Sequence, residues 1–129
     1  MLFGMAYFVI GVAFGELAGA ASSDQTRVIW RLGAWFASGV AFAAHIWYEH
    51  FSMRHVPRWT AMHTSLSVAI GAFALAAMAN IHDLSSTTGY RPIMLIALIA
   101  WPLLTAVPAY GVAWGVAAFF SWRQKINEQ

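Results

Sequence analysis

The chain has 129 residues, of which 60% are hydrophobic and 9% charged. A soluble domain carries about 25% charged residues, so this chain has too few charges to cover a surface exposed to water. The absence of cysteine excludes disulfides, thiolate metal sites and cysteine nucleophiles. The net charge of +2, without any polybasic run, argues against nucleic acid as a partner.

Four long apolar stretches fill most of the chain, and three short polar connectors separate them. A helix needs about 20 apolar residues to cross the hydrocarbon core of a bilayer. Three stretches reach that length, and the second reaches it if it continues to Phe51. The sequence therefore predicts an all-α integral membrane protein, a single domain of four transmembrane helices with up-down topology, embedded in a lipid bilayer. The predicted spans are residues 2–21, 32–51, 60–81 and 93–122.

The first predicted span carries a stripe of small residues and one acid. Gly11, Gly15 and Gly19 recur at every fourth position, a spacing that lets helix backbones approach one another in lipid. Glu16 stands beside this stripe, and an ionisable group at membrane depth is costly unless it faces protein. We expect Glu16 to face the bundle, as a hydrogen-bonding strut or as a group that exchanges protons. The stripe serves packing within the bundle or, alternatively, self-association.

The second and third spans form a predicted antiparallel hairpin that turns near Arg54. Residues equally far from the turn of such a hairpin lie at similar depth, and His45 and His63 are equally far from Arg54. Glu49 lies one helical turn from His45 and on the same face. We therefore expect His45, Glu49 and His63 to converge inside the hairpin.

Four interpretations of this cluster remain open. Imidazole and carboxylate together suit a divalent metal such as Zn²⁺, Cu²⁺ or Ni²⁺, or non-haem iron. Two imidazoles also suit axial ligation of haem, and a chain of histidine and glutamate suits a proton relay. The fourth interpretation, which we favour, is that no cofactor binds and the histidines hydrogen-bond to one another, to Glu49 or to backbone.

The regular spacing of His45, His50 and His55 adds little to the metal interpretation. A step of five residues turns a side chain by about 140° around a helix, so three rings on a continuous helix would not face one point. We therefore expect His50 and His55 to lie beyond the cluster, in the connector.

The fourth predicted span contains two prolines and a second pair of glycines. Pro102 and Pro108 each remove a backbone donor and favour a kink. Gly111 and Gly115 repeat the four-residue spacing of the first span, so we expect them to mediate helix packing.

In its four spans, its length and its acidic first-span residue Glu16, the chain resembles the small multidrug-resistance exporters. The resemblance implies a dimer that exchanges protons for cationic drugs at the shared carboxylate. It covers the architecture and one residue. The chain departs from that family in the long second connector, which bears histidine and arginine, and in the helix that contains Pro102 and Pro108.

The functional expectation follows from what the chain lacks. It has no motif of a hydrolase or of a phosphate-binding loop, and its connectors are too short for a soluble catalytic site. We therefore expect a subunit or accessory partner of a larger membrane complex, or a homo-oligomer, without catalytic residues. The alternatives are a small proton-coupled transporter or channel that uses Glu16 and the histidine cluster, and a haem- or metal-binding membrane protein.

The distribution of basic residues predicts the orientation in a bacterial-type cytoplasmic membrane. The side that holds both termini has four basic side chains and the other side has three, which favours cytoplasmic termini. The first group comprises Arg54, Arg58, Arg123 and Lys125, and the second comprises Arg27, Arg31 and Arg91.

Overall fold

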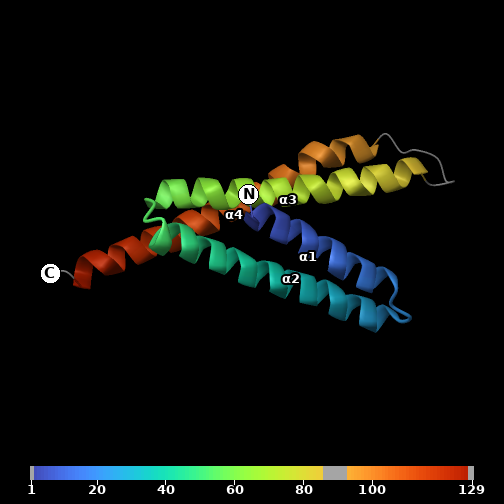
Figure 1. Ribbon diagram of the computed structural model, residues 1–129, viewed down its shortest axis with the longest axis horizontal. Coiled ribbons are helices and arrows are strands. Elements are labelled where there is room, and N and C mark those ends of the chain that lie inside the picture. The colour runs from blue at the N-terminus through green and yellow to red at the C-terminus, as the bar shows by residue number, and fades with distance from the viewer. Residues whose placement is uncertain (1, 86–92, 128–129) are drawn as a thin grey trace.

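The computed structural model (Figure 1) describes residues 2–85 and 93–127. Within these residues every regular element is a helix, so the predicted all-α architecture is confirmed for them. Arg91 lies outside the described residues. The elements are α1 (Leu2–Gly19), α2 (Asp24–Trp47), one π-helical segment η1 (Tyr48–Ser52), α3 (Pro57–Ser85) and α4 (Ile93–Asn127).

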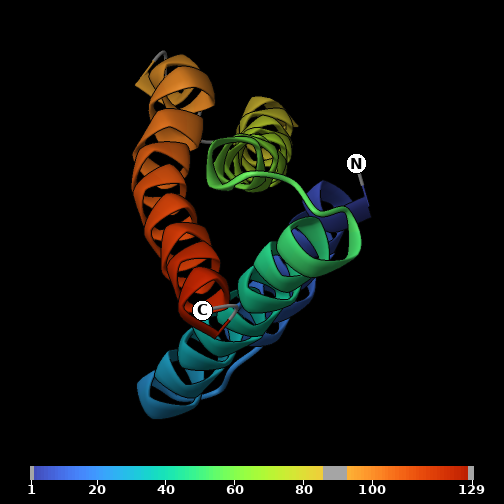
Figure 2. The same cartoon turned by 90° about the vertical axis from the view of Figure 1, so that its left-hand side faces the viewer.

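The four long helices alternate in direction along the chain (Figure 1). α3 lies against α4 in the most extensive contact of the molecule, and α1 packs against both α2 and α3. α2 makes only a small contact with α3 and α4. Figure 2 views the end at which α2 passes through η1 into α3 and at which the C-terminal part of α4 lies. This end positions the candidate site.

Three of the helices are long and apolar enough to cross a bilayer. They are Leu2–Gly19, Pro57–His82 within α3 and Leu95–Asn127 within α4. Among the described helices α2 does not meet these criteria of length and composition. Three of the four predicted spans, the first, third and fourth, therefore correspond to helices long and apolar enough to cross a bilayer. The second predicted span, in α2, does not meet these criteria.

The second predicted span, residues 32–51, lies within a longer helical segment. α2 begins at Asp24, because the Ser23 hydroxyl caps it by accepting a hydrogen bond of 3.1 Å from the Thr26 amide. The apolar stretch marks where a helix can enter lipid, whereas the cap marks where the helix begins. At the other end, η1 continues the helical segment as far as Ser52.

Glycines bring α1 and α3 into close contact. A Cβ added to Gly71 would lie 2.7 Å from Tyr7 Cβ and 3.1 Å from the carbonyl oxygen of Gly4. A Cβ added to Gly11 would lie 2.5 Å from Leu75 Cδ1. Small residues of this kind are the usual basis of helix contact in lipid, where no hydrophobic driving force holds helices together.

Small side chains also fill the contact among α2, α3 and α4. Ala61 of α3 and Ala113 of α4 are fully buried and pack with Ile46 from the last turn of α2. Phe42 and Val116 surround this cluster and are partly buried. The core therefore lies near the end of the molecule that carries η1. α4 continues through both prolines without interruption.

The connector from η1 to α3 reverses the chain at Arg54, whose φ of 54° lies in the left-handed region that non-glycine residues seldom adopt. Directly after it, the His55 amide donates a hydrogen bond of 3.1 Å to the Glu49 carbonyl. Pro57 then opens α3, at a helix position where a missing amide hydrogen costs nothing. His55 is thus folded back toward Glu49.

Candidate metal-binding site

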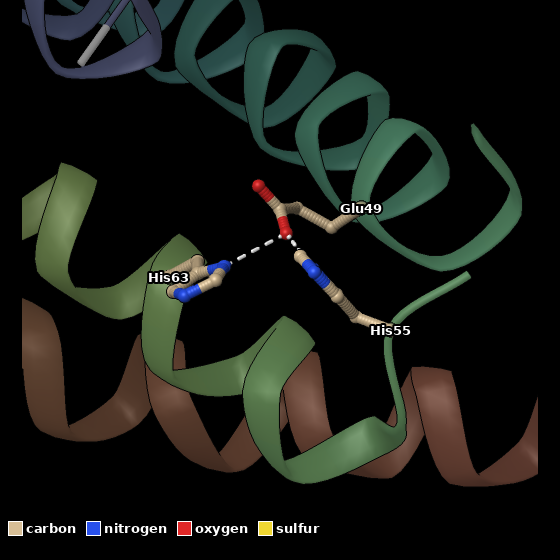
Figure 3. Close-up of side chains that lie close together, drawn as sticks. All are labelled: Glu49, His55 and His63. Atoms are coloured by element: carbon tan, nitrogen blue, oxygen red, sulfur yellow. Dashed lines mark hydrogen bonds and ion pairs between the residues drawn. The ribbon is translucent and has the colours of Figure 1, made fainter. Parts of the chain in front are cut away.

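Glu49 lies at the centre of a group of histidines at the η1 end of the molecule (Figure 3). Its side chain is 12% exposed. Glu49 Oε2 lies 2.6 Å from Nδ1 of His55 in the connector and 2.9 Å from Nδ1 of His63 on α3. Glu49 Oε1 lies 3.6 Å from Nε2 of His45, near the end of α2. One carboxylate therefore joins η1 to α2, to the connector and to α3.

The charge on Glu49 determines which ring atoms carry protons. Burial by itself would raise the pKa of Glu49, but the hydrogen bonds from His63 and His55 together hold that pKa below its usual value. The group lies past the end of α2 and is ionised at neutral pH. Because an ionised carboxylate only accepts hydrogen bonds, the Nδ1 atoms of both histidines donate to it.

His45 is fixed by packing as well as by its approach to Glu49. Its ring stacks on Phe3 of α1, with ring centroids 3.9 Å apart and an angle of 7° between the planes. The residue is only 3% exposed. Its Nδ1 has no hydrogen-bond partner within the described part of the chain. His45 therefore anchors the beginning of α1 beside the cluster.

The structure brings together three of the four residues that the sequence singles out for a relay or ligand cluster, namely His45, Glu49 and His63. His55 also joins the cluster, contrary to the expectation that it lies beyond it. A rotation of about 140° keeps the rings apart only along one continuous helix, and the helix ends before His55. Pro57 indicates a break in the helix near this point, because the residue directly before a proline disfavours helical backbone.

Glu16 is not part of the cluster. The helix from Phe3, which touches His45, to Glu16 is about 20 Å long. The expectation that Glu16 faces the bundle is wrong, because its side chain is exposed. Tyr7 and Ala18 belong to the buried face of α1, and Glu16 lies about 200° around the helix from Ala18. No other described residue pairs with its carboxylate.

The glycines expected to mediate packing fall into two groups. Gly11 contacts α3 through Leu75, as described above. At the other four positions an added Cβ would meet nothing within 4 Å, so close approach of a described helix does not require glycine there. They are Gly15, Gly19, Gly111 and Gly115.

The donor atoms fit a divalent transition metal. The ligand atoms of Glu49, His55 and His63 all lie within 4.8 Å of one another. Around a tetrahedral Zn²⁺, with bonds of about 2.0–2.2 Å to nitrogen and oxygen, neighbouring ligand atoms lie about 3.4 Å apart. An ion would replace the two protons that now lie between the rings and the carboxylate, with a small outward shift of the rings.

Haem fits this geometry poorly. Axial ligation by two histidines requires a planar slot between the rings, but His45 and His63 both approach the same carboxylate. His45 also has its ring face covered by Phe3. The arrangement therefore suits a single small cation held by one oxygen and two or three ring nitrogens.

Comparison with protein families, with curated proteins and with solved structures finds no match to this chain.

Proposed function

We propose that this chain is an integral membrane protein that binds one divalent transition-metal ion, of the Zn²⁺ class, through Glu49, His55 and His63. The observation that carries the proposal is the convergence of two imidazoles on one carboxylate oxygen, at 2.6 and 2.9 Å. These residues come from η1, the connector and α3. A bound ion would therefore fix the turn of the α2–α3 hairpin.

His45 lies next to the proposed site but outside the group of ligand atoms within 4.8 Å of one another, so it could become a fourth donor only by moving closer. Its Nε2 lies on the side of the other carboxylate oxygen, 3.6 Å from Glu49 Oε1. A structural zinc site is usually closed by four protein ligands. With His45 in place the site has the composition of a structural or storage site, with three histidines and one carboxylate. Without it, the fourth position is open to water or to a second molecule.

Membrane insertion of all four helices is part of the proposal. Three helices have the required length and composition. The exposed side chains of α2 are the argument for the fourth, because Trp35 is 80% and Phe36 78% exposed. Apolar surface on this scale marks a contact with lipid or with another protein. α2 would then cross with its polar first turns in the headgroup region.

The orientation that we propose places both termini and the cluster on the cytoplasmic side of a bacterial-type membrane. The basic residues Arg54, Arg58, Arg123 and Lys125 support it, since cytoplasmic segments carry an excess of lysine and arginine. All four are exposed. The metal would then be taken from the cytoplasm. A cysteine accessibility scan on intact cells, with single cysteines at these positions, tests the orientation.

Metal content of the purified protein tests the proposal directly. The protein is extracted in mild detergent from cells supplied with zinc, and its metal is counted by elemental mass spectrometry. We expect about one ion per chain, and loss of that ion in Glu49→Gln and in His63→Ala. His82→Ala, which removes a histidine from the far end of α3, is the matched control and keeps the ion. Full occupancy in Glu49→Gln contradicts the proposal.

A second candidate function, a subunit or accessory partner of a larger membrane complex or a homo-oligomer, is supported by pairs of glycines at which an added Cβ would meet nothing within 4 Å. Gly111 and Gly115 lie on α4, and Gly15 and Gly19 on α1. In lipid such positions are suited to a helix of another chain. Native mass spectrometry after mild extraction tests this candidate, since a monomer without stoichiometric partners argues against it.

A further inference from the structure

A second polar feature lies beside the histidine cluster, between the α2–α3 connector and the last turns of α4. It is an open cavity of about 660 Å³. Its wall includes both polar side chains and the apolar residues Phe51, Val56 and Pro57. The polar lining residues are His50, Arg54, His55, Ser121, Gln124 and Asn127.

The charge of the lining is one-sided. Arg54 and two histidines contribute every ionisable side chain of the wall, and no carboxylate lines it among the described residues. Ser121, Gln124 and Asn127 are neutral and each offers hydrogen-bond donors. No described carboxylate pairs with the Arg54 guanidinium. A cavity with this lining favours an anion.

His50 is buried without the hydrogen bonds that a buried imidazole requires. The residue is 7% exposed, and neither ring nitrogen has a partner among the described residues. Its ring lies edge-on to Phe51, with centroids 4.8 Å apart, and 5.8 Å from the ring of Phe120 on α4. A buried polar group without a partner is costly, so its persistence calls for a ligand or water. His50 lines the cavity, and a shift of its ring toward the cavity would let a ligand there satisfy one of the two buried nitrogens.

Arg54 adds a second, independent feature. Its φ of 54° is a conformation that costs a residue with a side chain free energy. Strain of this kind persists where the surrounding structure requires it, often at ligand sites. Here it holds a guanidinium at the rim of the cavity, at the end of the helices that we propose to lie near the membrane surface.

We propose that this cavity binds a phosphate-class oxyanion, with Arg54 and His50 as its principal donors. The guanidinium matches two oxygens of a phosphate in a planar fork, and the neutral imidazole donates one further hydrogen bond. Ser121 and Gln124 complete the donor set from α4. The cavity shares His55 with the proposed metal site, but its principal donors, Arg54 and His50, are not among the proposed metal ligands, and Glu49 does not line it.

Two sources can supply this anion, namely the phosphodiester of an anionic lipid headgroup and free phosphate. Two arms of one experiment distinguish them. Detergent-purified protein is titrated with inorganic phosphate by calorimetry, and protein in nanodiscs that contain phosphatidylglycerol is examined by native mass spectrometry for retained lipid. Binding in either arm supports the site and identifies the source. Binding in neither arm overturns the proposal.

The decisive variant is Arg54→Gly. It removes the guanidinium, and glycine adopts the left-handed conformation without strain, so the connector keeps its turn. We expect affinity for the anion to fall at least about tenfold, the scale of a lost charge-assisted hydrogen bond. The melting temperature is expected to stay the same or rise. Unchanged affinity in Arg54→Gly overturns the proposal.

Arg123→Gln is the matched control. It also removes a guanidinium near the C-terminal end of α4, but Arg123 does not line the cavity. The affinity of this variant for the anion is expected to stay within about twofold of the wild type, since the charge that is lost does not line the cavity and is screened by salt. An equal loss in both variants shows a diffuse charge effect and overturns the assignment. Anion binding is expected to persist after chelation of the metal and in His63→Ala. Failure of the anion proposal is therefore distinguishable from failure of the metal proposal.

Discussion

Glu49 Oε2 and His63 Nδ1 lie 2.9 Å apart although the two residues are separated by 14 positions in the chain. This contact links η1 to the beginning of α3 across the connector. His55 donates to the same oxygen from within that connector. The three residues therefore close the α2–α3 hairpin at one point, and the first prediction concerns the stability of that closure.

Glu49→Gln is expected to destabilise the chelated protein by about 1–3 kcal/mol, because hydrogen bonds to a charged acceptor are replaced by weaker bonds to a neutral one. The amide oxygen of glutamine can take the place of Oε2 and accept from both rings, but it carries no charge. Unfolding in detergent with EDTA present, followed by circular dichroism, measures the difference. Glu16→Gln is the control and should change stability little, since Glu16 is exposed.

A bound metal ion should stabilise the folded protein beyond the contribution of the hydrogen bonds to Glu49. An ion that binds only the folded protein stabilises it by about 2.7 kcal/mol at a free concentration of 100 times its dissociation constant. We expect the melting temperature of the wild type to rise with zinc and that of Glu49→Gln and His55→Ala to stay constant. A zinc-dependent rise of equal size in Glu49→Gln would show that the ion binds elsewhere.

The lowered pKa of Glu49 predicts how the closure depends on pH in the chelated protein. A carboxyl whose pKa is lower in the folded state than its ordinary value of 4.5 stabilises the fold fully above that value. The contribution is lost as pH falls through the lowered folded pKa. The stability difference between wild type and Glu49→Gln should therefore shrink as pH falls below 4.5, as measured by urea unfolding across pH. A difference that grows as pH falls below 4.5 contradicts this assignment.

The sequence is sufficient to predict the helices but not where they end. The length of their apolar stretches identifies α1, α3 and α4, because about 20 consecutive apolar residues are needed to cross a bilayer and such runs are rare elsewhere. Hydropathy does not indicate the start of α2, because Ser23 caps a helix whose first turns are polar. A hydropathy profile does not detect polar helical turns. The start of this helix is set instead by one capping hydrogen bond to a single hydroxyl.

Part of the candidate site was accessible to sequence reasoning for a simple geometrical reason. His45 and Glu49 share a helix face, and His63 lies opposite them in any hairpin that turns near Arg54. The place of His55 depends on one left-handed backbone residue, and no periodic pattern encodes that conformation in an arginine. The exposure of Glu16 depends on which face of α1 meets α3, and Gly4 and Gly71 determine that face by close approach.

Two buried threonines on α3 provide a matched test of polar burial. Thr60 and Thr64 are both 0% exposed. The Thr60 hydroxyl donates to the His55 carbonyl at 3.5 Å, whereas the Thr64 hydroxyl has no partner among the described residues. We expect Thr64→Val to be neutral or stabilising and Thr60→Val to cost about 0.5–1.5 kcal/mol. Thermal unfolding of both variants in one detergent checks the order, and a larger loss in Thr64→Val would contradict it.

Substitutions at two glycines, Gly71 and Gly115, distinguish helix contacts within the chain from helix contacts with another chain. Gly71→Ala places a Cβ 2.7 Å from Tyr7 Cβ and 3.1 Å from the Gly4 carbonyl oxygen, so α1 and α3 must move apart. We expect a loss of about 1–3 kcal/mol, the usual cost of overpacking. Gly115→Ala is the control, because its Cβ meets nothing within 4 Å and alanine favours helix.

Unfolding of the isolated chain in detergent should therefore show Gly71→Ala destabilised and Gly115→Ala unchanged or stabilised. The same two variants, expressed in cells and extracted under native conditions, then report on partners. If α4 contacts another chain at Gly115, Gly115→Ala should lower the yield of the native complex even though the monomer is as stable as the wild type. Equal destabilisation of the isolated chain by both variants would show that the α1–α3 contact does not depend on the missing Cβ of Gly71.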